Sequence, residues 1–505
     1  PEVADLVTYE CHIGTLTKRG TFESAIEQLP RLRAIGINAV EVMPVASFPG
    51  RWNWGYDGAS LFAPAEVYGG PKGFRRLVDA AHAQGIAVIL DVVYNHFGPD
   101  GNYTGLYSSG YLTDRYPTPW GDAINFDGER SEDVRRFFRE NLLHWLHEYH
   151  IDGFRFDATH AIFDRKERHI LAELSDAVHH WARDEHVPYL FAESHENDPK
   201  YVIPVADGGF GFDGVWADDF HHIVRTILHR DRDGYFASYE GSVEELARTV
   251  EQGFYFEGQN DPWPGEARGK PAREQPWRQF VYAIQNHDQV ANRAFGQRLN
   301  VTAASEDFLA VSLFFLLLPQ TPLLFQGQEF MATNAFLYFT DHEPGLGRAV
   351  TEGRREEFRR FRAFADPVLR ERIPDPQDPA TFYRSKLPLD EATFGIGMLC
   401  QDMYAAAIAT RASDTVLRAA RRERAPVRTL VVGKAVLVEI AAAGSRRIIV
   451  VNFGDEARFP LEGSWTIELA SAEARFGGNG EEIRFENGEL VVLPHMAAFL
   501  VPSAP

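Results

Sequence analysis

The chain has 505 residues, of which 45% are hydrophobic and 13% aromatic, and it carries a formal charge of −21. This length allows roughly two to four domains with large cores. The strong negative charge argues against a nucleic acid or an acidic membrane surface as a partner, because phosphate binding needs clusters of Lys and Arg. We therefore expect a large soluble enzyme that acts on another class of molecule.

The start of the chain, its most apolar window and its cysteines favour a cytoplasmic location. Pro1–Asp5 is acidic and polar, whereas a secretion signal needs a basic stretch and an apolar core. The window over residues 308–318 is shorter than the roughly 20 residues that span a bilayer, and Pro319 closes it. Cys11 and Cys400 lie in apolar surroundings far apart in the sequence, as reduced core cysteines do.

Short apolar runs alternate with helical segments along most of the chain. The first run precedes a predicted helix over 23–35, which Gly36 ends, and the second precedes a predicted helix over 73–84. Such alternation indicates βαβ units and a parallel sheet. Eight strands are predicted, at residues 6–12, 39–44, 87–92, 153–157, 189–193, 214–218, 280–284 and 322–326. The fold class is therefore α/β, a (β/α)8 barrel, with its last helix expected over 352–362.

Two regions depart from the barrel rhythm. Residues 97–130 hold clusters of Gly and Pro without clear periodicity and are predicted to be a short insertion after the third strand. Beyond the barrel, expected to span 1–365, short β runs separated by polar turns follow one another. Residues 366–505 are therefore predicted to form a linker and a C-terminal antiparallel β-sandwich.

Four predicted strands are followed or ended by carboxylates in short polar motifs. The motifs are Asp91–His96, Gly153–Asp157, Phe191–Ser194 and Gln285–Asp288. In parallel barrels the active site lies at the carboxyl ends of the strands, so these acids are expected to converge on one cleft.

Retaining cleavage of a glycosidic bond needs two carboxyl groups about 5–5.5 Å apart, one nucleophilic and one acidic. Arg155 precedes Asp157 by two residues on the same strand face, where its guanidinium would lower the pKa of that carboxylate. Asp157 is the predicted nucleophile, although an Arg–Asp pair on a strand is more often structural. Glu193 ends an apolar run and is the predicted general acid, the alternative being a solvent-facing glutamate.

The order and wording of these motifs resemble the signature regions of the α-amylase family, retaining hydrolases and transferases of α-glucans. The resemblance implies that Asp288 is the third catalytic acid and binds sugar hydroxyls, while Asp91 organises the site. It also implies that His96 and His287 donate hydrogen bonds to the sugar and that Tyr56 lies under the ring being cleaved. For Trp52 and Trp54, beside Tyr56, ordinary core packing is an equal alternative.

A metal site is not expected. Asp218, Asp219, His221 and His222 are adjacent pairs that project in different directions, without a second cluster to complete a site. Asn95 matches a calcium ligand of some α-amylases, but the short loop after it offers no evident partners. We expect neither metal nor cofactor.

Segments between the motifs narrow the resemblance to one branch of the family, the maltooligosyltrehalose trehalohydrolases. The segments are 195–199, 216–222, 286–293, 336–342 and 353–358, within a resemblance that covers about 5–386 and thins over 398–421. It implies cleavage of the α-1,4 bond next to the terminal trehalose of maltooligosyltrehalose, with a maltooligosyltrehalose synthase as metabolic partner.

Arg155, His160 and Asp219 are the further substrate-binding residues expected in this branch, and His160, Ser194–Asp198 and Asp219 are expected to select trehalose. A branching enzyme, a debranching enzyme and an ordinary α-amylase remain alternatives. So does a non-catalytic barrel that only binds glucan, although such relatives lose the carboxylates that this chain keeps.

Overall fold

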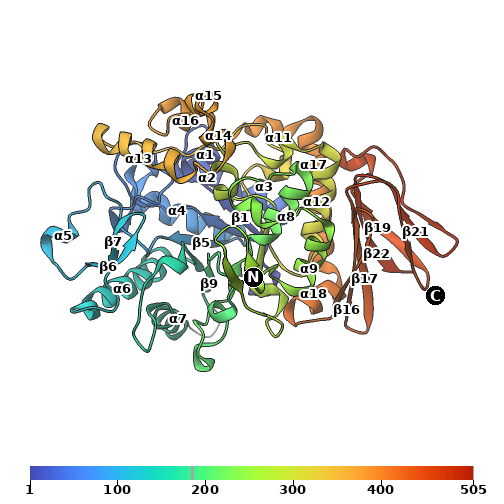
Figure 1. The fold of residues 1–505 in the computed structure, drawn as a ribbon, viewed down its shortest axis with the longest axis horizontal. Helices are drawn as coiled ribbons and strands as arrows, with labels where there is room; N and C mark the ends of the chain where they lie inside the picture. Colours follow the sequence, from blue (N-terminus) through green and yellow to red (C-terminus); the bar gives the residue numbers. More distant parts are fainter. Residues whose placement is uncertain (183–186, 504–505) are drawn as a thin grey trace.

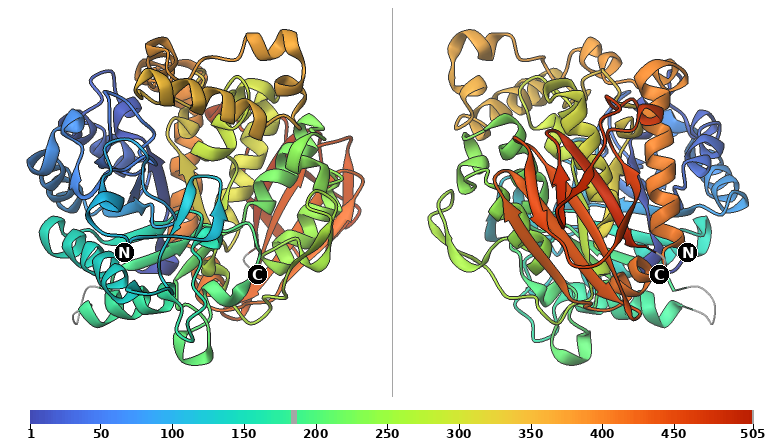
Figure 2. Two further views of the ribbon diagram at one scale, coloured as in Figure 1. Left: turned by 60° about the vertical axis from the view of Figure 1, so that its left-hand side comes forward. Right: turned by 90° about the vertical axis from the view of Figure 1, so that its right-hand side faces the viewer.

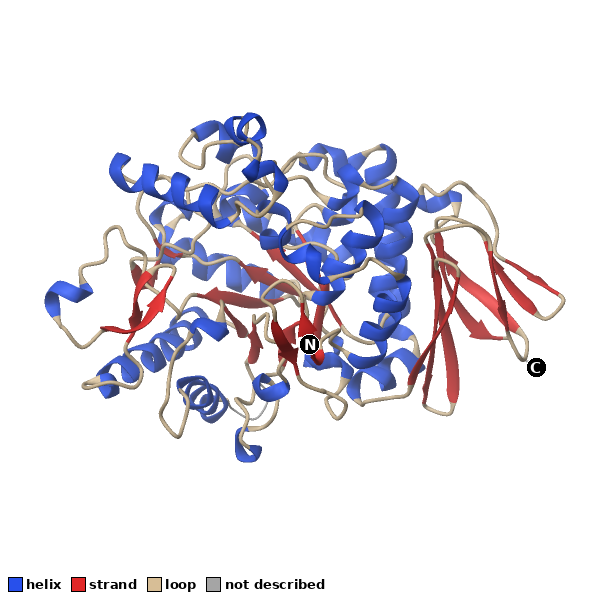
Figure 3. Ribbon diagram, viewed as in Figure 1, coloured by secondary structure: helices blue, strands red, loops and turns tan. Residues whose placement is uncertain are grey.

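The computed structural model describes residues 1–182 and 187–503. Strands of a barrel lie at the centre of the larger part and helices surround them, while a second group of strands lies at the C-terminal end (Figures 1 and 3). No helix within the described residues is both long and apolar enough to cross a membrane.

The barrel is closed by eight parallel strands in the order β1-β14-β13-β10-β9-β8-β5-β2. Their bounds are β1 Thr8–Cys11, β2 Ala39–Val42, β5 Ala87–Val92, β8 Gly153–Phe156, β9 Tyr189–Ala192, β10 Gly214–Trp216, β13 Phe280–Ala283 and β14 Thr321–Phe325. Each falls on a predicted strand, which confirms the (β/α)8 fold. Most of their residues are buried, as expected for strands covered on both faces.

Helices cover the outside of the barrel. The longer ones are α4 Gly70–Ala83, α6 Ser131–Tyr149, α7 Ile170–Trp181, α8 Asp219–His229, α9 Val243–Gln252, α12 Ser305–Leu317 and α17 Gly395–Ser413. Helix α12 is apolar on all sides because it is enclosed, with every residue from Phe308 to Leu317 buried. It packs against α17, where Tyr404 donates a hydrogen bond to Ser312 at 2.9 Å.

The prediction that residues 352–362 form the last barrel helix is wrong. The observed helix there is α13 Pro344–Glu357, whose only buried residues are Gly347 and Thr351. It is followed by short helices, α14 Arg362–Ala365, α15 Pro367–Glu371 and α16 Pro379–Arg384, at the top of Figure 1. The outer layer of the barrel is completed instead by α17, which buries Cys400, Met403 and Tyr404 in the main core.

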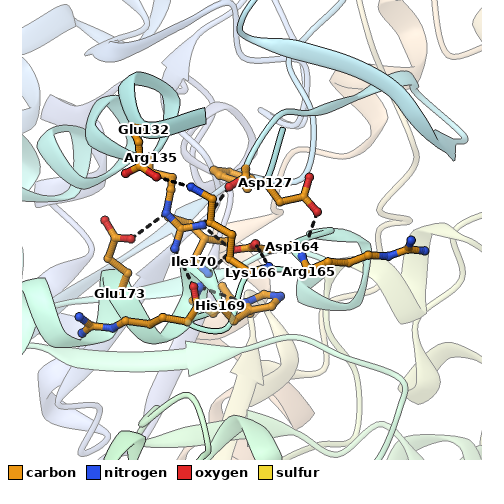
Figure 4. A network of polar contacts seen from close by, with 12 residues as sticks. Asp127, Glu132, Arg135, Asp164, Arg165, Lys166, His169, Ile170 and Glu173 are labelled. Atoms are coloured by element: carbon orange, nitrogen blue, oxygen red, sulfur yellow. Dashed lines mark hydrogen bonds and ion pairs between the residues drawn. The ribbon is translucent and has the colours of Figure 1, made fainter. Parts of the chain in front are cut away.

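The insertion after β5 contains a short helix, α5 Thr104–Tyr107, and a hairpin of β6 Leu112–Thr118 and β7 Gly121–Ile124. Arg135, a buried arginine on α6, links the end of this insertion to the loop that follows β8 (Figure 4). Arg135 donates to the Phe126 carbonyl at 2.9 Å, to Asp164 at 2.5 Å and to Glu173 at 2.7 Å. Because the loop after β8 carries Asp157 and His160, this network fixes one wall of the candidate site.

The C-terminal part contains two antiparallel sheets. One has the order β15-β16-β17-β22-β19 and the other β18-β21-β20. Their bounds are β15 Val427–Val432, β16 Ala435–Ala442, β17 Ser445–Asn452, β18 Ala457–Pro460, β19 Trp465–Ala470, β20 Arg484–Glu486, β21 Glu489–Val492 and β22 Met496–Pro502. Residues of both sheets share one core, while the opposite face of the larger sheet contacts α12 (Figure 2). The two sheets thus form a sandwich, which packs against the barrel helix α12.

Candidate active site

The predicted catalytic acids lie at the same end of neighbouring strands. Asp157 and Glu193 directly follow β8 and β9, and Asp288 lies in the first turn of α10 His287–Ala291, after β13. Backbone bonds from Asp157 N–H to the Val92 carbonyl and from Glu193 N–H to the Phe156 carbonyl continue the barrel ladder up to these acids. The sheet itself therefore brings together three carboxyl groups that are far apart in the sequence.

Asp157 is held by two donors. Arg155 Nη1 donates to its Oδ1 at 2.8 Å, and Asn95 Nδ2 donates to its Oδ2 at 2.8 Å. Both contacts stabilise the charged carboxylate, which a nucleophile must be. The sequence predicted the contact with Arg155, but it did not reveal the contact of Asp157 with Asn95.

Arg155 is the central cation of the site, with only 1% of its side chain exposed. It donates to Asp91 Oδ2 at 2.8 Å, lies 3.5 Å from Glu193 Oε2, and sits 4.3 Å over the ring of Trp216. Burial raises the pKa of Asp91 to about 6, against the opposing effect of Arg155. Asp91 therefore acts inside the barrel wall, as an anchor for Arg155.

Glu193 has the electrostatics of a general acid. Burial raises its pKa to about 8, and the negative charges of Asp157 and Asp288 add to this rise while Arg155 opposes it. The backbone N–H of Ala158 donates to its Oε2 and orients the carboxyl group. A carboxyl that keeps its proton at neutral pH, next to one stabilised as an anion, meets the requirement for acid-assisted glycoside cleavage.

Tyr56 and His287 stack with their ring centroids 5.2 Å apart, and the Tyr56 hydroxyl donates to Asp91 at 2.6 Å. Its only proton is used there, so the contact of 2.9 Å with His287 Nε2 has the histidine as donor. His287 Nδ1 in turn donates to Glu10 at 2.5 Å. Burial lowers the pKa of His287, but Glu10 more than offsets this and raises the pKa to about 9.

Sequence reasoning missed Glu10. It lies in the middle of β1, is 1% exposed, and accepts the backbone N–H as well as the ring of His287. A glutamate inside a strand that is otherwise predicted to be buried was the available signal, because an ionised carboxylate is rarely buried without a partner.

His96 supports the site from behind. Its Nε2 lies 3.0 Å from the Tyr56 carbonyl, its Nδ1 contacts Asn95, and its ring stacks on Trp120 at 4.5 Å. Both ring nitrogens contact protein atoms in this structure, and the hydrogen bond from His96 to sugar stays a prediction. Trp52 and Trp54 are core aromatics, stacked on Phe382 and Phe336 respectively.

Asp219 does not face the cleft. It is 0% exposed and accepts hydrogen bonds from Tyr239 at 2.6 Å, from the Tyr255 N–H at 2.8 Å, from Arg268 at 3.3 Å, and from Asn197. In this structure its oxygens are occupied by protein donors, so substrate binding by Asp219 stays a prediction. Its contacts join the segments that follow β9, α8 and α9.

His160 lies at the predicted place, in the short helical turn after β8. Its ring centroid is 4.0 Å from that of His195, in the loop after β9. Its Nδ1 is buried without a hydrogen-bond partner among the described residues. This nitrogen has an unused hydrogen-bonding capacity next to His195.

Metal-binding side chains do not assemble here. Within residues 1–182 and 187–503 no group of three His, Cys, Asp or Glu side chains is arranged to hold an ion. His221 Nδ1 bonds the Ile284 carbonyl at 2.7 Å, while His222 Nδ1 contacts Tyr239 at 3.2 Å. The two histidines serve separate structural contacts.

Comparisons with known proteins agree with this geometry. Residues 11–109 match the model of the alpha-amylase catalytic domain. The chain is 41% identical to malto-oligosyltrehalose trehalohydrolase of Deinococcus radiodurans over 91% of this chain and 74% of that protein. The enzyme of the same name from Saccharolobus solfataricus is 42% identical over 76% of this chain and 65% of its own length. A Salmonella typhimurium crystal structure, described as a candidate alpha amylase, superposes with a TM-score of 0.89 at 35% identity, covering 99% of this chain and 82% of that one.

Proposed function

Because the chain belongs to the malto-oligosyltrehalose trehalohydrolase family, within the α-amylases, we propose that it hydrolyses the α-1,4 bond next to the terminal trehalose of maltooligosyltrehalose. The products are free trehalose and a maltooligosaccharide. The observation that carries this proposal is a pair of carboxyl groups in different surroundings. Asp157 accepts hydrogen bonds from Arg155 and Asn95, whereas burial raises the pKa of Glu193 to about 8.

The reaction proceeds in two displacements. In the first, Asp157 attacks the anomeric carbon while Glu193 gives its proton to the glycosidic oxygen, so that trehalose leaves and a glycosyl–Asp157 ester forms. In the second, the Glu193 carboxylate takes a proton from water, whose oxygen attacks the same carbon and releases Asp157. Two inversions give net retention, and Glu193 ends protonated again.

The remaining polar groups support these steps. Tyr56 and His287 offer a stacked aromatic floor for the sugar ring, and Asp288 binds its hydroxyls. Arg155 holds the nucleophile and anchors Asp91. His160 contributes its unpartnered Nδ1 to the side where trehalose leaves.

Product analysis tests this proposal against the other activities of the superfamily. The protein is incubated separately with maltooligosyltrehalose and with a plain maltooligosaccharide of equal length. Free trehalose from the first substrate is the expected result. New branches, linear chains from a branched glucan, or maltose as the main product would instead identify a branching enzyme, a debranching enzyme or an α-amylase.

The proposal includes the setting of the reaction. A maltooligosyltrehalose synthase would supply the substrate, and both enzymes would work in the cytoplasm. The free, buried cysteines Cys11 and Cys400 suit a reducing compartment. Neither a metal nor a cofactor is required by the two-carboxylate mechanism.

A further inference from the structure

A carboxylate at the end of β10 is not used by any contact described so far. Asp218 precedes α8 as its N-cap, yet its side chain makes no capping hydrogen bond. Among residues 1–182 and 187–503 it also has no other side-chain hydrogen bond and no ion pair, in contrast with its saturated neighbour Asp219. An acidic side chain left unpaired at the rim of an active site is a candidate for binding substrate.

The direction of β10 places Asp218 toward the cleft. Trp216, two residues earlier, lies under the guanidinium of Arg155 and near His287, with ring centroids 6.3 Å apart in the second pair. The ladder continues past the strand, because the Ala217 N–H bonds the Val281 carbonyl at 2.9 Å. Asp218 follows two residues later, at the turn from β10 into α8, and so lies at the carboxyl end of the barrel where the other acids gather. The indole Nε1 of Trp216 is likewise buried and unpartnered within the described chain.

Asp218 lies between the general acid and Asp288. Strand β10 separates β9, which Glu193 follows, from β13, which Asp288 follows. Charge effects agree with this order. Burial, and after it the charge of Asp288, raise the pKa of Asp218 to about 7. The charge of Asp218 in turn contributes to the raised pKa of Glu193.

This position adjoins the group that serves the departing sugars. In the proposed reaction the sugar that forms the ester lies over Asp157 after β8, and Glu193 after β9 protonates the oxygen that departs. The next strand around the barrel is β10, so a group at its end lies beside Glu193. Asn197 and Glu196, which follow β9, are already bonded to Asp219 and Tyr201.

We infer that Asp218 binds a hydroxyl group of the trehalose unit as it leaves and thereby helps the enzyme to distinguish trehalosyl ends from plain maltooligosaccharide ends. This inference rests on the proposed function and assigns to Asp218 the selecting role that the sequence suggested for Asp219. A carboxyl group suits this task because it accepts from a sugar hydroxyl when ionised and donates when protonated. Trehalose is bent at its 1,1 linkage, so its outer glucose lies where the next sugar of a linear glucan does not.

The test compares one variant on two substrates. Asp218→Asn keeps the size of the side chain and removes its charge. We expect kcat/KM on maltooligosyltrehalose to fall about ten- to hundredfold, the range for losing a hydrogen bond to a charged group. On plain maltooligosaccharide the loss is expected to be about threefold or less. Changes in Glu193 acidity affect both substrates alike and cancel in the ratio. Equal losses, or none, would overturn the inference.

Two controls separate a failed inference from a failed function. Asp207→Asn, at an exposed aspartate in the short turn η5 Val205–Asp207, is expected to change neither rate. If the unaltered protein releases no trehalose at all, the proposed function fails before Asp218 is judged.

A binding measurement gives a second readout without turnover. Trehalose and maltose are titrated calorimetrically into Glu193→Gln, with and without Asp218→Asn. The second substitution is expected to weaken trehalose binding at least about tenfold and maltose binding much less. Unchanged trehalose affinity in the double variant would contradict a direct contact.

Discussion

The buried pair of Glu10 and His287 allows a quantitative prediction about stability. Both side chains are almost completely enclosed by the barrel, and two hydrogen bonds join them. Glu10→Gln preserves the shape of the side chain and an acceptor for the His287 backbone, but it removes the negative charge that keeps the imidazole protonated. We expect the variant to lose stability at neutral pH, because burial lowers the pKa of His287 and Glu10 is the main group that offsets this effect.

The size of the effect follows from the histidine pKa. It rises from 6.5 in an unfolded chain to about 9 in the fold, which corresponds to about 3 kcal/mol of stabilisation. Since the folded pKa is the higher one, this contribution is complete below pH 6.5 and is lost as the pH rises through 9. The difference between the original protein and Glu10→Gln should therefore be about 3 kcal/mol at pH 6 and should shrink towards zero at pH 10.

Denaturant unfolding across this pH range measures the difference, and Glu41→Gln is the matched control. Glu41 pairs with Glu10 across β1 and β2 and is equally buried, but burial and the charge of Glu10 raise its pKa well above the ordinary range. This shift favours the neutral form of Glu41, so its amide analogue should cost little. A loss for Glu10→Gln that is the same at pH 6 and pH 10, or a loss of equal size for Glu41→Gln, would refute the reasoning.

Three further predictions follow from the catalytic centre and its supporting wall. Asp157→Asn and Glu193→Gln should each lower kcat by about 10²-fold or more with unchanged thermal melting, and a folded variant with near-normal turnover would remove that residue from the mechanism. The value of kcat/KM should fall as the pH rises through about 8, where Glu193 loses its proton. If kcat/KM already falls as the pH rises through about 5, Glu193 is not the general acid. Arg135→Met leaves the buried Asp164 with two backbone N–H donors but without its cation, so the free energy of unfolding should drop by about 3–5 kcal/mol, whereas Arg136→Met on the exposed face should change it by less than about 0.5 kcal/mol.

The strands of the barrel could be predicted because the sequence pattern has a direct physical cause. A parallel strand covered on both faces reads as a continuous apolar run, and all eight strands carried that signal. The convergence of Asp157, Glu193 and Asp288 then follows from chain direction alone, since parallel strands end on one side. The contact between Arg155 and Asp157 was predictable for the same reason, from the period of two along a strand.

The outer helices were harder to predict, because a helical periodicity in the sequence does not show what the helix packs against. Residues 352–362 look like a surface helix and 398–421 look unusual for the barrel, but α17 is the helix enclosed by α12 and the core. Its buried residues recur every three to four positions, from Gly397 to Arg411, whereas Ile396 and Met398 on another face are exposed. We propose on this basis that the catalytic part extends through α18 Thr415–Arg422, with the sandwich beginning at β15.

The pair Asp218–Asp219 shows where sequence reasoning about a site reaches its limit. Adjacent residues at a strand–helix junction project in different directions, so the two carboxyl groups are not expected to face the cleft alike. Which one does is decided by register and by donors supplied from elsewhere in the chain. Arg268 and Tyr239 follow Asp219 by 49 and 20 positions, and no local sequence pattern predicts that they donate hydrogen bonds to it. Because these donors occupy the oxygens of Asp219, the unpaired carboxyl group of Asp218 is the one left for the substrate. The contact with trehalose that the sequence suggested for Asp219 is therefore assigned to Asp218.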